Sequence, residues 1–541
     1  MRRSIALALA ASILLAAPAA VFAQERTELV VSCPAGGIGF DPHAAITATE
    51  AQIFTAIYEG LFTYDPATLE PIKAAAGAFS RSPDGKVYTF TIASDAAWSN
   101  GDRLTAAHFR DAWLRMLEPE READYAAFFD VIEGAREFRT GKLKDKAKVG
   151  VVAKSDAVLE VRLENPAAYF TRLLCHHSFS PVHPSMLALD DWEGVAAAGK
   201  LPVNGPFAVA SYSADELRVV RNPRYRDAAA VRLDAIRFPF IDEDAEVSRL
   251  YNNGEIHWAT GNFDYDSLLA KEDVQAHPMF ATHYWFFRSD RGPWAKADVR
   301  RALALLLPWD EIRDEELYGI VAETLVLPFE GYEAPEGIVE ADLDEAMALL
   351  EKAGFPEGKR LPAIRFMIPD GEDARRIAAL MGDTWKELLA LEYEVAVVPP
   401  SRFFEKVKSE DYDISLTSWI GDFADPLAFL QMWVSDSNLN DARWKEAGYD
   451  ELIAKSNAQD GAKRAATLAE AEALLLGGAA VMPIYHSLAI NLVNPEAVDG
   501  WFDNVLDIHP FKAMGFGSWQ PMPGVASGGA FAGTGAELAF R

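Results

Sequence analysis

Residues 417–430 read TSWIGDFADPLAFL and place the carboxylate of Asp422 among Trp419, Phe423 and Phe429. Moving a carboxylate out of water costs several kcal/mol unless a cation or several N–H donors compensate its charge. Asp422 is therefore either half of a structural ion pair or the anchor for a positively charged group of a ligand. The residues of this segment alone favour the structural ion pair.

The two ends of the chain differ in composition from the rest. Residues 1–23 carry Arg2 and Arg3, an apolar run and small residues up to Ala23, the pattern of a cleaved signal peptide without a lipidated cysteine. No later stretch has about 18 uninterrupted apolar residues, so we expect export to the periplasm and no membrane insertion. Residues 519–541 are rich in Gly and Ala and predict a flexible tail.

Length and charge narrow the class of protein. A chain of 541 residues predicts two to four domains, and its formal charge of −30 argues against binding to nucleic acid or to an anionic membrane surface. Only two cysteines are present, so disulfides do not hold a chain of this size together. Whether Cys33 and Cys175 form one bridge stays open, because the sequence does not give their separation.

Strand and helix patterns alternate along the whole chain and predict mixed α/β lobes. Period-two or apolar runs predict strands at 27–33, 88–92, 158–163, 217–222, 235–241, 363–368 and 393–398. Helical spacing and capping residues predict helices at 46–62, after Thr105, at 245–253 before Gly254, from Asp298 and from Ser401.

Motifs of enzymes and metal sites are weak or missing in the sequence. No G-x-S-x-G, H-E-x-x-H or Walker loop occurs, so we expect neither catalysis nor a cofactor. The nearest approach to a metal site is Cys175, His176 and His177 with His183. Adjacent residues of an extended strand point to opposite faces, so we expect these histidines to serve packing or the surface and expect no metal site.

Eight segments, taken in order, resemble the extracellular solute-binding proteins of peptide ABC importers, the oligopeptide- and dipeptide-binding group. They are GFDPH (39–43), IYEGLFTYD (57–65), YTFTIASDAAWSNGDRLTAAHF (88–109), SPVHP (180–184), VNGPF (203–207), ADVRRALAL (297–305), the opening segment 417–430, and VMPIYH (481–486).

This resemblance implies a periplasmic-binding-protein-like fold, a three-lobed Venus flytrap. Two main lobes close around the ligand on a hinge, and an extra lobe is added to them. Lobe I would comprise residues 24–58, 184–283 and 500–518, the extra lobe II residues 59–183, and lobe III residues 284–499.

The resemblance also implies a function and a set of site residues. The protein would be a monomer that captures short peptides between the lobes and delivers them to an inner-membrane ABC permease. In such relatives the peptide lies extended and pairs with backbone on both lobes, while an aspartate holds its α-ammonium group. The matching residues for backbone pairing are Ile46, Thr47, Ala48, Ser418, Trp419 and Ile420, and the aspartate is Asp422.

Four positions depart from the family pattern. Leu416 replaces an arginine that can meet the ligand carboxylate, Asp111 replaces a ligand-contacting tyrosine, Ser401 replaces a tryptophan of the pocket wall, and Arg288 replaces an asparagine. We therefore expect Asp111, with the acidic surface, to favour basic peptides.

Other functions stay open at this point. The same fold can bind a metal chelate, a sugar or an opine. An exported hydrolase and a chemoreceptor partner or chaperone-like binder are the remaining classes.

Overall fold

The computed structural model describes residues 28–517 with some gaps. Outside the described residues within this range are Ala35, Ala168, residues 315–318, Glu330, Glu410, Asp422, Ala424, Asp460 and the side chain of Ser401. The predicted signal peptide, the predicted tail and the predicted anchor Asp422 therefore lie outside the described residues. In the part of the chain that is described, no helix is both long and apolar enough to cross a bilayer.

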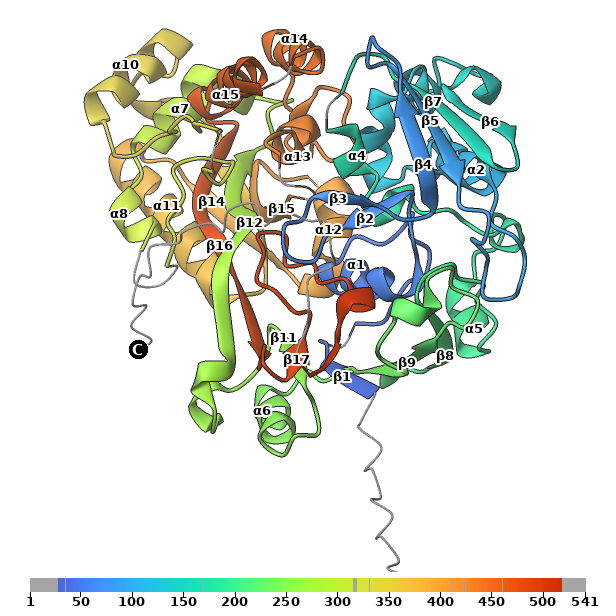
Figure 1. Cartoon of the computed structure of the whole chain (residues 1–541). Helices are drawn as coiled ribbons and strands as arrows, with labels where there is room; N and C mark the ends of the chain where they lie inside the picture. The colour runs from blue at the N-terminus through green and yellow to red at the C-terminus, as the bar shows by residue number, and fades with distance from the viewer. Residues whose placement is uncertain are drawn as a thin grey trace, which may run out of the picture.

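A ten-stranded mixed sheet runs through the molecule in the order β14-β13-β15-β12-β16-β11-β1-β10-β9-β8 (Figure 1). Its strands are β1 (Glu28–Ser32), β8 (Phe207–Tyr212), β9 (Glu216–Arg221), β10 (Ala235–Pro239), β11 (Trp258–Thr260), β12 (Val274–Phe287), β13 (Ile364–Pro369), β14 (Tyr393–Val398), β15 (Ile414–Ile420) and β16 (Val481–Val493).

The antiparallel strands β12 and β16 join the two halves of this sheet. They pair from Val274↔Leu492 at one end to Phe286↔Val481 at the other, with irregularities between Pro278 and Thr282 and between His283 and Tyr284. One end of the pair lies near β11 and α6, and the other lies among the helices of the second half (Figure 1). These two strands therefore connect the two main lobes.

A separate four-stranded antiparallel sheet, ordered β4-β5-β7-β6, forms the core of the extra lobe. Its strands are β4 (Ala76–Arg81), β5 (Val87–Ile92), β6 (Val151–Ser155) and β7 (Val158–Arg162). Two short pairs complete the strands: β2 (Phe62–Tyr64) with β3 (Pro71–Lys73), and β17 (Val498–Asp499) with β18 (Gly515–Phe516). We use the names lobe I, extra lobe and lobe III for the parts with β8–β10, β4–β7 and β13–β15.

The helices cover these sheets and are mostly short. They are α1 (Ala48–Ile57), α2 (Ala106–Met116), α3 (Ala135–Arg139), α4 (Phe170–Leu173), α5 (Trp192–Ala197), α6 (Asp244–Asn252), α7 (Ala297–Leu305), α8 (Trp309–Ile312), α10 (Leu343–Ala353), α11 (Glu372–Leu389), α12 (Pro400–Ser409), α13 (Leu427–Leu430), α14 (Ala447–Ser456) and α15 (Gly461–Gly477).

Most elements predicted from local patterns are confirmed within one or two residues, including β5, β7, β14, α2 and α6. Helix α1 is shorter than predicted, because Tyr58 turns to extended backbone with φ −120° and ψ 151°. Leu61 is buried as expected, but it lies beyond the helix. The open question of a disulfide is also answered, since Cys33 and Cys175 are both free thiols.

Gly205 allows the segment after α5 to pass directly under the end of α1. Its amide donates to the carbonyl of Ile57 at 2.9 Å, and a Cβ at this position would lie 2.5 Å from the backbone carbon of Ile57. The neighbouring Asn204 side chain is bonded to the backbone N–H and carbonyl of Glu59. These contacts fix the backbone where α1 ends.

We predict that Gly205→Ala lowers the free energy of unfolding by about 1 to 3 kcal/mol, because the added methyl group meets backbone that cannot rotate away. The midpoint of urea denaturation measures this. Gly477→Ala is the control, since nothing lies within 4 Å of a Cβ there, and it should raise the midpoint or leave it unchanged. A wild-type midpoint for Gly205→Ala would contradict the close approach.

Candidate functional site

A cavity of about 440 Å³ lies where the three lobes meet. Its lining combines the first turn of α1, the β2 strand, the segment after Cys175, the end of β15 and the loop that follows η11 (Gln431–Trp433). Most of the wall is aromatic or aliphatic, and a cavity of this size and character is typical of small-ligand sites. The lining side chains that carry the argument below are Thr47, Tyr125, Tyr284, Lys408, Trp419, Trp433 and Asp441.

The first turn of α1 is held rigid by Glu50. The Glu50 carboxylate accepts hydrogen bonds from the amides of Gly39 (3.0 Å), Ile46 (3.3 Å) and Thr47 (3.2 Å) and from the Thr47 hydroxyl (2.8 Å). Thr47 in turn accepts from the Glu50 amide at 3.2 Å, which completes a capping box. The wall formed by Ile46, Thr47 and Ala48 is therefore fixed before any ligand arrives.

The opposite wall is the end of β15, where the strand pairs on one side only. Residues Ile414–Ile420 pair with β12 along their whole length, but β13 reaches only Ile414 and Ser415. Within the described residues no strand pairs with the other edge from Thr417 to Ile420, and these residues line the cavity. An exposed strand edge of this kind can receive an extended chain by backbone hydrogen bonds.

Gly421 and Trp419 fix the shape of this wall. A Cβ on Gly421 would lie 2.3 Å from the ring of Phe280, and the Gly421 amide donates to the Phe280 carbonyl at 2.7 Å. The Trp419 indole N–H donates to the carbonyl of Ala428 at 2.9 Å, which orients its ring along the cavity. The glycine is thus needed for packing, not for an unusual backbone angle.

The structure brings together six of the eight predicted site residues, since Ile46, Thr47, Ala48, Ser418, Trp419 and Ile420 all line this one cavity. Asp422 lies outside the described residues. Asp111 does not line the cavity and forms a two-bonded ion pair with its neighbour Arg110, at 2.8 and 3.0 Å. Leu416, expected from the resemblance to stand where relatives have an arginine, packs against the hydrophobic core of lobe III.

Charged side chains gather at one end of the cavity. Lys408 of α12 and Asp124 of the 3₁₀ helix η2 (Asp124–Val131) form an ion pair between lobe III and the extra lobe. Asp441 lines the same end, and burial raises its pKa to about 6. The departure at position 288 lies nearby, where Arg288 pairs with Asp290 at 3.2 Å and stacks on the ring of Tyr412.

Cys175, His176 and His177 also line the cavity. The backbone here is a turn into the 3₁₀ helix η4 (His177–Phe179), not the extended strand assumed from the sequence, and the two imidazole rings lie 4.1 Å apart. Burial lowers the pKa of His176 to about 3, so that ring is neutral. Among the described residues no group of three or more His, Cys, Asp or Glu side chains could hold a metal ion.

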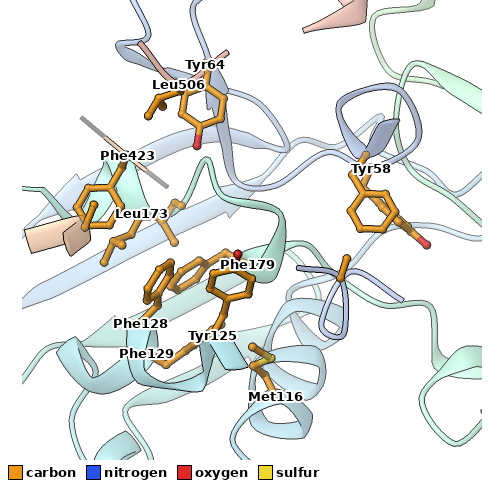
Figure 2. Close-up of a cluster of buried hydrophobic side chains, with 14 of the residues drawn as sticks. Tyr58, Tyr64, Met116, Tyr125, Phe128, Phe129, Leu173, Phe179, Phe423 and Leu506 are labelled. Carbon is orange, nitrogen blue, oxygen red and sulfur yellow. The ribbon is translucent and has the colours of Figure 1, made fainter. Parts of the chain in front are cut away.

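The extra lobe and lobe III are in direct contact outside the cavity lining. Arg136 of α3 donates to both carboxylate oxygens of Asp436, at 2.6 and 2.8 Å, and Tyr169 donates to Asn457 at 2.8 Å. Beside these polar contacts Phe423 packs on Phe128, with ring centroids 6.2 Å apart, in the buried aromatic cluster of Figure 2. The extra lobe and lobe III are therefore in direct contact through both polar and aromatic side chains.

Several lining residues were missed from the sequence, among them Lys408, Asp124, Asp441, Tyr125 and Trp433. They come from parts of the chain that are far apart in the sequence, and no local pattern indicates that these parts meet. Glu50 could have been found, because T-x-x-E at residues 47–50 is the sequence pattern of a capping box.

Solved structures show the same architecture. The structure of the Escherichia coli murein tripeptide binding protein MppA and that of Haemophilus influenzae OppA in complex with RPPGFSPFR are each 25% identical, cover 91% of this chain and 99% of theirs, and give a TM-score of 0.79. The unliganded open form of MppA gives a TM-score of 0.65. It is also 25% identical, and the match covers 91% of this chain and 98% of its own.

Related proteins and a family model agree with the comparison of structures. Dipeptide-binding protein DppE of Bacillus subtilis is 29% identical over 84% of this chain and 86% of its own, and oligopeptide-binding protein OppA of the same species is 30% identical over 85% and 87%. The family described as bacterial extracellular solute-binding proteins, family 5 Middle, matches residues 70–441. The resemblance inferred from the eight segments is confirmed, and the chain belongs to the bacterial extracellular solute-binding proteins of family 5.

Proposed function

We propose that this protein is a periplasmic receptor that captures short peptides in the cavity between its lobes and delivers them to an inner-membrane ABC permease. The observation that carries the proposal is the free edge of β15, which faces the cavity opposite the rigid first turn of α1. The relatives named above as dipeptide- and oligopeptide-binding proteins support it. We also propose that the protein is a monomer without catalytic activity and that its lobes have the boundaries given above.

An extended peptide suits these two walls because its main chain carries regularly spaced donors and acceptors. Backbone pairing with Thr417–Ile420 would bind a peptide of almost any sequence, since the side chains take no part in it. The aromatic and aliphatic lining would cover those side chains and exclude water. We further propose that Asp422, which follows directly after this wall, holds the α-ammonium group of the peptide.

Closure of the lobes would enclose the ligand. Ligand contacts made by all three lobes exist only in the closed form, so ligand binding shifts the equilibrium towards closure. The higher TM-score with the OppA complex than with open MppA, and the contacts Arg136–Asp436 and Lys408–Asp124, support a closed form.

The first prediction concerns ligand class. Isothermal titration calorimetry should give saturable one-to-one binding of tri- and tetrapeptides, with a negative heat-capacity change because apolar surface is buried. Glucose and a nickel–histidine chelate are the comparison ligands and should give no binding heat. Binding of either comparison ligand, with no binding of peptides, would contradict the proposal.

The second prediction concerns Asp422. Asp422→Asn should weaken peptide binding by about 3 to 5 kcal/mol, at least about 100-fold in Kd, because the buried ammonium group loses its counter-charge. N-acetylation of the peptide should weaken binding to the wild type and change little in the variant. Unchanged affinity in Asp422→Asn would remove this residue from the site.

The third prediction concerns closure. Arg136→Ala removes a half-exposed contact between the lobes without touching the cavity, and we expect a two- to fivefold faster release of a bound tripeptide, about 0.5 to 1 kcal/mol. Stopped-flow displacement measures the rate. Arg249→Ala, which breaks an equally well-formed pair with Glu246 on α6, is the control. Equal release rates for both variants would show that the Arg136 contact does not hold the lobes closed.

A further inference from the structure

Asp441 is an acidic side chain in the cavity wall that has no polar partner among the residues that the structure describes. It lies in the loop after η11, and in the described part of the chain its carboxylate takes part in no hydrogen bond and no ion pair. Asp441 is part-buried, and a carboxylate partly removed from water is unfavourable unless a cation meets it.

The cations around Asp441 are all engaged elsewhere. Lys408 pairs with Asp124, and Arg288 pairs with Asp290 at 3.2 Å. Arg443 donates to the backbone carbonyl of Lys408 at 3.2 Å. Their charges act on Asp441 only from a distance, so no cation of the described residues is in contact with it and a cation of the ligand can take that position.

The surroundings of Asp441 suit a long cationic side chain. Tyr284 and Trp433, whose ring centroids are 5.6 Å apart, line the same cavity, and so do Phe286 and Phe404. The charge of Asp441 contributes to the raised pKa values of Tyr284 and Tyr412, which places it close to these rings. Aromatic faces bind the methylene groups of lysine and attract its ammonium group.

The loop that carries Asp441 is fixed by its neighbour. The Asn440 amide group donates to the carbonyls of Trp433 (3.4 Å), Val434 (3.3 Å) and Trp444 (2.7 Å), and its oxygen accepts from the Trp444 amide at 3.1 Å. Because Asn440 is buried and fully bonded, the position of Asp441 is set before binding. A preorganised charge loses little entropy when it meets its partner.

We propose that Asp441 forms a subsite for the cationic side chain of a lysine- or arginine-bearing ligand. This inference rests on the proposed function, since it takes a peptide as the bearer of that side chain. The sequence led us to expect that Asp111 causes a preference for basic peptides. The inference assigns this preference to Asp441 instead. Asp111 already has its cation in Arg110, whereas Asp441 has none among the described residues.

The subsite should weaken in acid. The groups that act on Asp441 are Lys408, Arg443, Arg288 and Asp124, and together with burial they give it a pKa of about 6. A bound ammonium group favours the ionised form and lowers this pKa. The preference for a cationic side chain is therefore full at pH 7.5 and decreases as the pH falls below about 6.

The test compares alanine tripeptides that carry one lysine with matched tripeptides that carry norleucine, which has the same chain length without the charge. Each replacement is made at all three positions, and the ratio of the two Kd values is measured by calorimetry. At pH 7.5 we expect the wild type to prefer lysine about tenfold or more at one position. Asp441→Asn should bring this ratio close to one, whereas Asp111→Asn should retain it.

The wild type supplies a second measurement that needs no variant. At pH 5.0 its lysine-to-norleucine ratio should fall towards one, and effects of other titrating groups cancel because both peptides share them. A ratio near one at pH 7.5 at every position, or a ratio kept in Asp441→Asn, would overturn the inference. If the norleucine peptides still bind in that case, the proposed peptide function stands, whereas binding of neither series would overturn both.

Discussion

The pairing of β12 with β16 is the constraint on which the rest of the structure depends. Both strands extend from one half of the ten-stranded sheet into the other. The two main lobes therefore share this pair of strands. The pairing is irregular in its middle, between Pro278 and Tyr284, where a regular ladder would be stiffest. At this point His486 is hydrogen-bonded to Thr282 at 2.9 Å, which ties the two strands together through side chains as well. A ladder that is continuous but locally irregular can hold two lobes in register and still allow them to rotate.

Local elements were predictable because their signals lie within a few residues. The alternation of residues 88–92 and the Thr105 cap predict β5 and α2 without knowledge of any distant partner. β12 could not be found in this way. It carries Pro278, and its second half is buried on both faces, so period-two alternation is lost. Its partner β16 follows about two hundred residues later, and no local rule indicates such a pairing.

The candidate site, too, was predictable from the sequence only in part. The walls at residues 46–48 and 418–420 were predicted from short segments that resemble a known family, and both line the cavity. The charged end was not predicted, because Lys408, Asp124 and Asp441 lie on three separate elements far apart in the sequence, and no local pattern indicates that they meet. The prediction for Asp111 followed from position in a pattern, and the structure pairs this residue with Arg110 instead. A formal charge of −30 does not by itself identify the acid that a ligand meets, since most acids at the surface have solvent or arginine beside them.

The central claim is that the cavity between the lobes holds short peptides, and the material that co-purifies with the protein tests it most directly. The protein is purified without denaturation, unfolded in acid, and the released small molecules are sequenced by tandem mass spectrometry. The account predicts a mixture of short peptides of varied sequence with lysine or arginine over-represented. A single non-peptide solute released in stoichiometric amount would contradict it.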